Sequence, residues 1–202
     1  MGQKRPGPIW ATAMTTFELL AEKERIPNKN GITGTYVDVI LEHNHHHEHR
    51  NLDDVNKIID NSSLDENVKD LSKRIFLRVA KAESKVHNKP LNEIHFHEVG
   101  AIDSIVDIVG TAILINKINP DKIISSVVND GYGFIECAHG TMGVPVPATS
   151  EIFASSNVKF RQIDIDTELV TPTGAAIIAE LADEFTYLPQ MVTEKIMSIE
   201  LF

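Results

Sequence analysis

Apolar side chains recur every three or four positions in three stretches of the chain, and this spacing predicts amphipathic helices. The first expected helix covers Leu52–Ile59, with Asn51 as its candidate N-cap. The second runs from about Asp65 to His87 and ends before Pro90. The third, Ile102–Ile118, is apolar on most faces. We therefore expect this third helix to be buried widely and to be the central helix of the core.

Apolar and polar residues alternate in shorter runs, and this alternation predicts strands. A strand-like run begins at Phe17 and another covers Gly34–Leu41, and the turn composition of Pro27–Gly31 between them predicts a hairpin. In the second half of the chain, short strands and helices follow one another. The expected strands are Lys122–Val128, Gly131–Cys137, Val158–Ile165 and Met191–Ile199, and the expected helices are 148–156 and Thr173–Phe185.

The order of these elements predicts the fold class. Strands that alternate with helices are typical of α/β proteins, so we expect a layered α/β domain of short strands with the buried central helix at about 102–118. Residues 1–16 show no periodicity, and we interpret them as a loose leader. The remainder, 17–202, is then a single α/β domain with a His-rich loop at 43–49 after the N-terminal hairpin.

Composition narrows the possible functions. The 202 residues carry a net charge of −10, which opposes binding to nucleic acid or to an anionic membrane but is compatible with cation handling. The chain has neither a long apolar run of membrane-spanning length nor a signal-peptide core. One cysteine, Cys137, excludes an internal disulfide and favours a cytoplasmic setting.

The densest chemical feature is a run of histidines in the first quarter of the chain. Five histidines fall within seven residues, and Glu42 and Glu48 lie beside them; the histidines are His43, His45, His46, His47 and His49. Imidazole suits nickel, copper and zinc, and a flexible run fits capture and transfer of a metal better than a fixed catalytic site. The alternatives are an expression tag, which such an internal and interrupted run does not resemble, and a solvated loop without a role.

A second candidate site lies at the predicted start of the third helix. His95 and His97 share one face of an extended segment, and Asp103 and Asp107 share one face of a helix. Gly100 lets the chain turn between these pairs. Two imidazoles and two carboxylates that converge indicate a divalent-metal or acid–base site. The alternative is that the acids only stabilise the helix N-terminus.

Two further segments combine glycine or proline with polar residues. In the first, His139 is a candidate ligand, whereas Cys137 alone is more typical of a small core residue. Glycines around them allow close backbone approach to a ligand. In the second, Thr171 is a candidate cap for a helix that starts at Pro172, and such a helix start can seat a phosphate or carboxylate.

Four runs together resemble the nickel insertion protein family of nickel-pincer cofactor biosynthesis, which serves lactate racemase maturation. They are His45–Arg50, His95–Gly110, Ala138–Met142 and Glu168–Ala176, and the similarity covers about residues 30–200. The resemblance implies a lyase-class nickel chelatase that delivers nickel(II) to pyridinium-3,5-bisthiocarboxylic acid mononucleotide. One ring carbon and two sulfurs then hold the metal. It also implies use of CTP with Mn²⁺ or Mg²⁺.

Our leading hypothesis is therefore a nickel insertase or its N-terminal portion. We expect the histidine run to collect nickel and the inner site to be lined by His95, His97, Glu98, Asp103 and Asp107, with His139 as a further candidate. We expect the helix start to seat the substrate phosphate through Thr171, Thr173 and Gly174. The family carries a C-terminal domain associated with nucleotide binding and oligomer formation, and this chain ends before it. We therefore expect a truncated copy, with the C-terminal portion as a separate chain and a second copy of this chain as candidate partners.

Two other functions remain open on the sequence. A nickel storage or buffering protein accounts for the histidine run but not for the segments around His97 and Thr171. A metal-dependent hydrolase accounts for the inner site, with His95, His97 and Asp103 as ligands of a metal that activates water.

Overall fold

The structure of the chain is a computed structural model that describes residues 50–96 and 102–192, together with the backbone of four short strands nearer the N-terminus. The chain divides into two compact units. One comprises residues 1–46 and 189–202, and the other comprises residues 47–188.

The smaller unit contains the expected hairpin. Strand β1 (Leu19–Glu22) pairs antiparallel with β4 (Val39–Leu41), and between them β2 (Asn28–Lys29) pairs antiparallel with β3 (Ile32–Thr33). The predicted pairing of the two N-terminal runs is therefore confirmed. The leader, the histidine run 43–49 and most of the predicted strand 191–199 lie outside the described residues.

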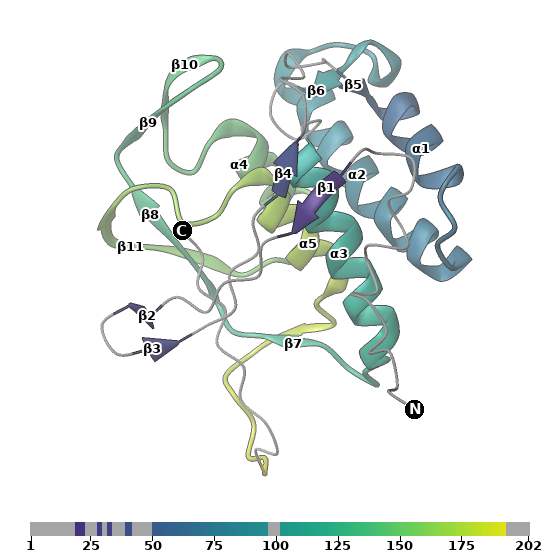
Figure 1. The fold of residues 1–202 in the computed structure, drawn as a ribbon. Helices are drawn as coiled ribbons and strands as arrows, with labels where there is room; N and C mark the ends of the chain where they lie inside the picture. The colour runs from purple at the N-terminus through teal and green to yellow at the C-terminus, as the bar shows by residue number, and fades with distance from the viewer. Residues whose placement is uncertain are drawn as a thin grey trace. The chain divides into compact units, whose positions relative to one another are not determined.

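The larger unit is organised around its longest helix. Helix α2 (Glu66–His87) packs against α1 (Leu52–Asp60), α3 (Ile102–Ile118), α4 (Pro147–Ala154) and α5 (Pro172–Leu181). Its apolar stripe includes three side chains with no exposed surface, namely Ile75, Phe76 and Val79. Figure 1 shows the other helices grouped about α2.

The expectation that Ile102–Ile118 is the central helix is wrong, although its bounds are confirmed. Helix α3 buries one face, which includes Ile105, Ile108 and Ala112, whereas Leu114 is 57% and Ile118 65% exposed. The apolar composition of α3 does not distinguish one face from another. Helix α2 has a narrower stripe with charged residues around it, and that stripe is what the other helices bury.

The ends of α1 and α2 follow from local sequence. Asn51 caps α1, because its side chain accepts a hydrogen bond from the Asp54 backbone while the Asp54 side chain accepts one from the Asn51 backbone. Helix α2 ends at Asn88, whose φ of 51° is a left-handed conformation that asparagine tolerates. Pro90 then prevents any continuation of the helix.

The strands of the larger unit form four pairs. Strand β7 (Ile124–Ser125) pairs parallel with β12 (Glu184–Phe185), and β8 (Val128–Tyr132) pairs parallel with β11 (Phe160–Asp166). Strand β9 (Phe134–Cys137) forms a hairpin with β10 (Gly140–Gly143), and β5 (Arg50–Asn51) pairs antiparallel with β6 (His95–Phe96) after a 3₁₀ turn at Leu91–Glu93. Parallel pairs joined through α4 and α5 confirm the α/β class.

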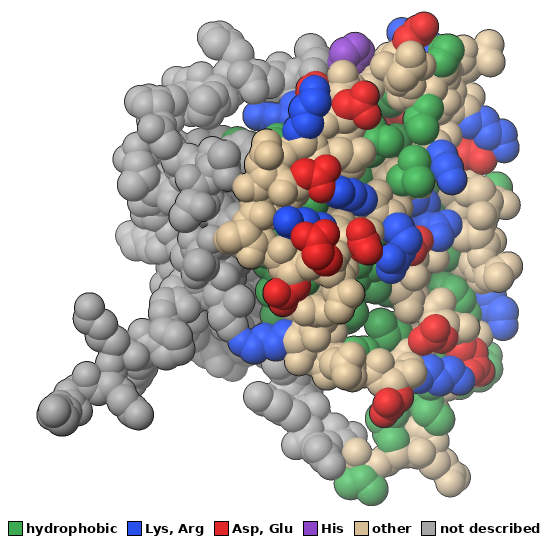
Figure 2. Space-filling model, turned by 90° about the vertical axis from the view of Figure 1, so that its right-hand side faces the viewer, with side chains coloured by type: hydrophobic (Ala, Val, Ile, Leu, Met, Phe, Trp, Pro, Cys, Tyr) green, Lys and Arg blue, Asp and Glu red, His purple; other side chains and the backbone are tan. Residues whose placement is uncertain are grey.

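The surface of the described residues mixes both signs of charge. Figure 2 shows Lys and Arg side chains interspersed with Asp and Glu over one face of the molecule, without a large patch of either sign. The excess of acidic side chains that gives the chain its net charge of −10 does not form a cluster on this face. Among the described helices, none combines the length and the apolar character that a bilayer crossing requires.

A paired carboxylate ties α5 to α2. Glu180 Oε1 accepts a hydrogen bond from Arg74 Nε at 2.7 Å, and its Oε2 accepts one from Arg78 at 2.6 Å. Burial acts to raise the pKa of Glu180, but the hydrogen bonds from Arg78 and Arg74 outweigh it and hold that pKa below its usual value of 4.5. The carboxylate therefore stabilises the fold in its ionised form.

We predict that Glu180→Gln lowers the free energy of unfolding at pH 7 by about 1–2 kcal/mol, because the arginines lose a charged partner. The loss in the free energy of unfolding reaches its full size above pH 4.5. It disappears as the pH falls through the lowered pKa of Glu180, because the parent then loses its charged carboxylate too. Urea denaturation at several pH values measures it. Glu66→Gln is the matched control, since Glu66 pairs with Lys69 on the exposed face of α2. Equal effects of the two substitutions would contradict the prediction.

Candidate functional site

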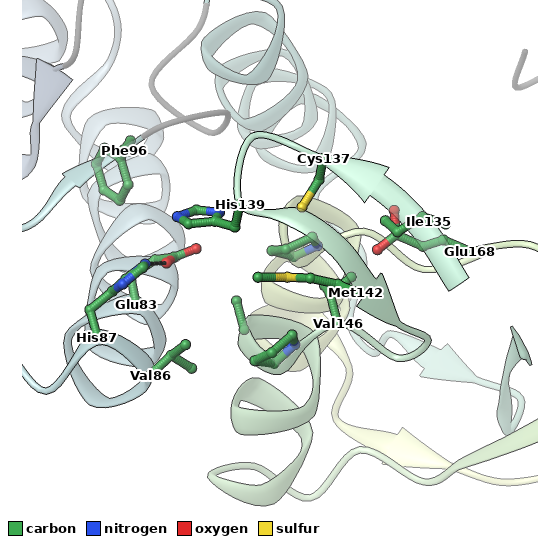
Figure 3. A pocket seen from close by; sticks show the side chains of 13 residues that line it. Glu83, Val86, His87, Phe96, Ile135, Cys137, His139, Met142, Val146 and Glu168 are labelled. Atoms are coloured by element: carbon green, nitrogen blue, oxygen red, sulfur yellow. Dashed lines mark ion pairs between the residues drawn. The ribbon is translucent and has the colours of Figure 1, made fainter. Parts of the chain in front are cut away.

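A cleft in the larger unit is walled by segments that are distant in the sequence. One wall is the C-terminal part of α2, and the opposite wall is the β9–β10 hairpin. Phe96 of β6, the first residues of α4 and Pro172 at the start of α5 complete it. Figure 3 shows these side chains around the opening. The cleft encloses about 70 Å³ and otherwise opens to solvent.

Metal-binding side chains of both walls meet in this cleft. His87 of α2 and His139 of the hairpin turn have their ring centroids 5.0 Å apart, with 38° between the ring planes. Glu83, one turn before His87, places Oε2 3.2 Å from His87 Nε2. Met142 of β10 also lines the cleft. Figure 3 shows His139 beside Glu83 and His87 at the side of the cleft formed by α2.

Cys137 lies in the cleft and not in the core where it was expected. It is partly exposed, and its Sγ donates a hydrogen bond to the Gly140 carbonyl at 3.3 Å. The physical reason is the hairpin: Cys137 is the last residue of β9, opposite Gly140, and the strands project over the cleft. The hairpin therefore contributes a thiol, an imidazole and a thioether to one site.

Two helix starts also lie at the cleft. Helix α5 begins as predicted, with Thr171 Oγ1 accepting a hydrogen bond from Gly174 N at 3.2 Å and Pro172 in the first turn. Helix α4 begins at Pro147 after Val146, which provides no side-chain cap. Pro147 and Pro172 both line the cleft, so the positive ends of two helix dipoles are directed at it.

A buried carboxylate fixes the segment that leads into α5. Asp130 of β8 has no exposed surface, and its Oδ1 accepts hydrogen bonds from the backbone N–H groups of Gly131, Leu169 and Val170 at 2.8, 3.0 and 3.2 Å. Buried Thr149 of α4 donates to the Val170 carbonyl at 3.2 Å. The polar groups of Val170 are thus held from both sides, and the start of α5 is fixed against β8 and α4.

The expected close approach at the glycines of this region is made by the chain itself. A Cβ atom on Gly131 would lie 1.9 Å from the Thr167 carbonyl oxygen. Gly133 has φ +92°, and a Cβ there would lie 1.9 Å from the Asp166 carboxylate. Both glycines therefore allow the end of β11 to pass close to β8, and no ligand is needed to account for them.

The predicted inner site is only partly described. His97 and Glu98 lie outside the described residues. His95 is exposed on β6, where strand alternation directs it away from the buried Phe96 that lines the cleft. Asp103 and Asp107 occupy successive turns of α3, and partial burial together with the Asp103 charge raises the pKa of Asp107.

The structure brings His139 next to His87. His87 is not among the site residues predicted from the sequence. A Glu and a His four positions apart on a predicted helix were the available signal, because such residues share one face. Across residues 50–96 and 102–192, no group of three His, Cys, Asp or Glu side chains is placed to hold one metal ion.

We predict that Asp130→Ala lowers the free energy of unfolding by about 2–4 kcal/mol, because three backbone N–H groups lose a buried acceptor. Hydrogen exchange is expected to accelerate first at Leu169 and Val170. Asp166→Ala, an exposed carboxylate at the end of β11, is the control. Unchanged exchange at Leu169 and Val170 would show that Asp130 does not hold this segment.

Comparison with known proteins matches the chain to one family model. Residues 10–198 match the model described as "Nickel insertion protein". A protein of Acetivibrio thermocellus named "Pyridinium-3,5-bisthiocarboxylic acid mononucleotide nickel insertion protein" is 52% identical over 187 residues, which cover 89% of this chain and 45% of that relative. A protein of the same name from Clostridium kluyveri is 49% identical over 178 residues, which cover 83% of this chain and 44% of the relative.

A "Putative nickel insertion protein" of Dictyoglomus thermophilum is 43% identical over 189 residues, which cover 93% of this chain and 48% of the relative. The chain thus spans about half the length of the curated relatives it matches. No solved structure matches it.

Proposed function

Because the chain belongs to the nickel insertion protein family, we propose that it takes part in delivering nickel(II) to pyridinium-3,5-bisthiocarboxylic acid mononucleotide. The observation that carries this proposal is the cleft, where imidazole and sulfur ligands of the hairpin lie beside the start of α5. One end of the cleft suits a late transition metal, and the other suits an anionic ligand. The three relatives named above are called nickel insertion proteins, and none is called a storage protein or a hydrolase.

The proposed path of the metal starts at the histidine run. Its five imidazoles, His43, His45, His46, His47 and His49, collect nickel(II) in an exchangeable form. The inner site then receives the ion, with His139 at the cleft and with His95, His97, Glu98, Asp103 and Asp107 as further candidates. Of these, His139 has the strongest support, because it shares the cleft with sulfur ligands and a second imidazole.

The start of α5 is the proposed seat of the substrate phosphate. Thr171, Thr173 and Gly174 form its first turn, where backbone N–H groups and the helix dipole favour an anion. Support comes from Pro172, which lines the same cleft, and from Asp130, which fixes the preceding residues.

The chemistry follows from the preferences of the metal. Transfer exchanges imidazole nitrogens for the two thiocarboxylate sulfurs of the substrate, and the softer ligands stabilise nickel(II) further. The bond from nickel to the ring carbon replaces a ring C–H bond, so a proton is released. Glu83, Glu168 and the imidazoles are groups of the cleft that can accept it.

Finer expectations rest on the family resemblance. They are the lyase class of the reaction, lactate racemase maturation as its purpose, a cytoplasmic location, and partnership with a separate C-terminal chain or a second copy. CTP with Mn²⁺ or Mg²⁺ belongs with them.

We predict that the full chain binds the mononucleotide precursor and, with nickel(II) present, converts it to a product heavier by one nickel less one proton. Mass spectrometry of the small-molecule fraction measures this, and calorimetry measures precursor binding without metal. Gly174→Asp, which places a carboxylate at the α5 start, is expected to weaken precursor binding at least tenfold while leaving nickel binding intact. A chain that binds nickel but never the precursor is a buffering protein.

We predict that alanine at positions 45, 46, 47 and 49 together removes most of the nickel bound per chain, because these imidazoles are the densest ligand set in the sequence. Calorimetric titration with nickel(II) gives the stoichiometry and affinity. Substitution of Asn44 by alanine, within the same run, is the control. Unchanged stoichiometry in the fourfold variant would eliminate the capture role.

A further inference from the structure

We propose that His87 and His139 form a two-imidazole metal site in the cleft, with Glu83 as the positioning residue of His87. The site takes a late first-row divalent ion. The geometry suits any ion of this class. That the physiological ion is nickel rests on the proposed function.

The distance between the rings fits shared coordination. Two imidazoles bound to one ion at about 2.0 Å place their ring centroids roughly 4.5–5.2 Å apart for angles at the metal of about 90–110°. The observed separation of 5.0 Å lies in that interval. A stacked pair without metal gives a similar separation. The ring distance alone therefore does not choose between the two.

The carboxylate of Glu83 favours coordination. Its Oε2 lies 3.2 Å from His87 Nε2, and the two side chains are only 17% and 28% exposed. Histidines that bind metals characteristically donate their second ring N–H to a carboxylate, which fixes the tautomer and makes the ligating nitrogen more basic. The Glu83 carboxylate is thus placed to orient the His87 ring.

The surroundings favour a late transition metal over a hard cation. Cys137 and Met142 place sulfur atoms in the same cleft, and Val86 and Phe96 contribute apolar walls. Imidazole and sulfur prefer nickel, copper, zinc or cobalt to magnesium and calcium.

The site is open. The described residues contain no group of three His, Cys, Asp or Glu side chains around one point, so the imidazole pair supplies two protein ligands. The remaining coordination positions are left to water or an incoming ligand. An ion held in this way can exchange its ligands without leaving the cleft.

The test uses the full chain with alanine at 45, 46, 47 and 49, so that the histidine run does not compete. Nickel(II) and cobalt(II) are added alone, without the mononucleotide. We expect one ion per chain, with visible cobalt absorption bands. His87→Gln and His139→Gln are each expected to weaken binding at least tenfold, and Glu83→Gln about tenfold through its effect on His87. Glu66→Gln, on the same helix but far from the cleft, is the control and leaves the affinity unchanged.

A second measurement, NMR line broadening by paramagnetic nickel(II), uses a chain whose cleft is unaltered. It therefore tests the site even if a cleft variant fails to fold. Substoichiometric nickel(II) is expected to broaden the ring resonances of His87 and His139 first. The proposal is overturned if folded His87→Gln and His139→Gln variants bind within twofold of their parent. It is also overturned if the parent binds no ion, or if both resonances stay sharp, since the rings are then only a stacked pair. Metal binding without product formation contradicts the proposed function but leaves this site standing.

Discussion

Burial of one stripe of α2 is the constraint on which the larger unit depends. Ile75, Phe76 and Val79 have no exposed surface, and four other helices pack against the helix that carries them. Each such side chain contributes about 1.5–3 kcal/mol when it is fully removed from water. The same helix continues past the core to Glu83 and His87, so the core determines the position and direction of one wall of the cleft.

The opposite wall depends on a polar interaction. Asp130 lies at the junction of β8 and the segment before α5, and it provides one buried acceptor for three backbone donors. The glycines that follow it let β11 pass so close that no side chain fits between the strands. The β9–β10 hairpin directly follows β8 of the β8–β11 pair, and the start of α5 is held beside that pair. A ligand cleft therefore has one wall set by apolar packing and the other by buried hydrogen bonds.

Local patterns predicted α1, α2 and α5 well because boundary residues in the sequence mark their ends. Asn51, Pro90 and Thr171 all mark boundaries that the structure has. The central helix was assigned wrongly, because hydrophobic content alone says nothing about which neighbours cover a helix; α2 has a sharper stripe than α3. The cleft could not be predicted, since it depends on bringing His87 to His139 and on a buried Asp130 that resembles an ordinary turn residue in the sequence.

The hairpin wall has a thermodynamic consequence. His87 and His139 stand about fifty positions apart in the chain, on elements that meet only across the cleft. An ion that needs both imidazoles binds the folded chain and not the unfolded one, so its binding free energy adds to the stability of the fold. Occupancy of the cleft and stability of the fold are then two measures of one equilibrium.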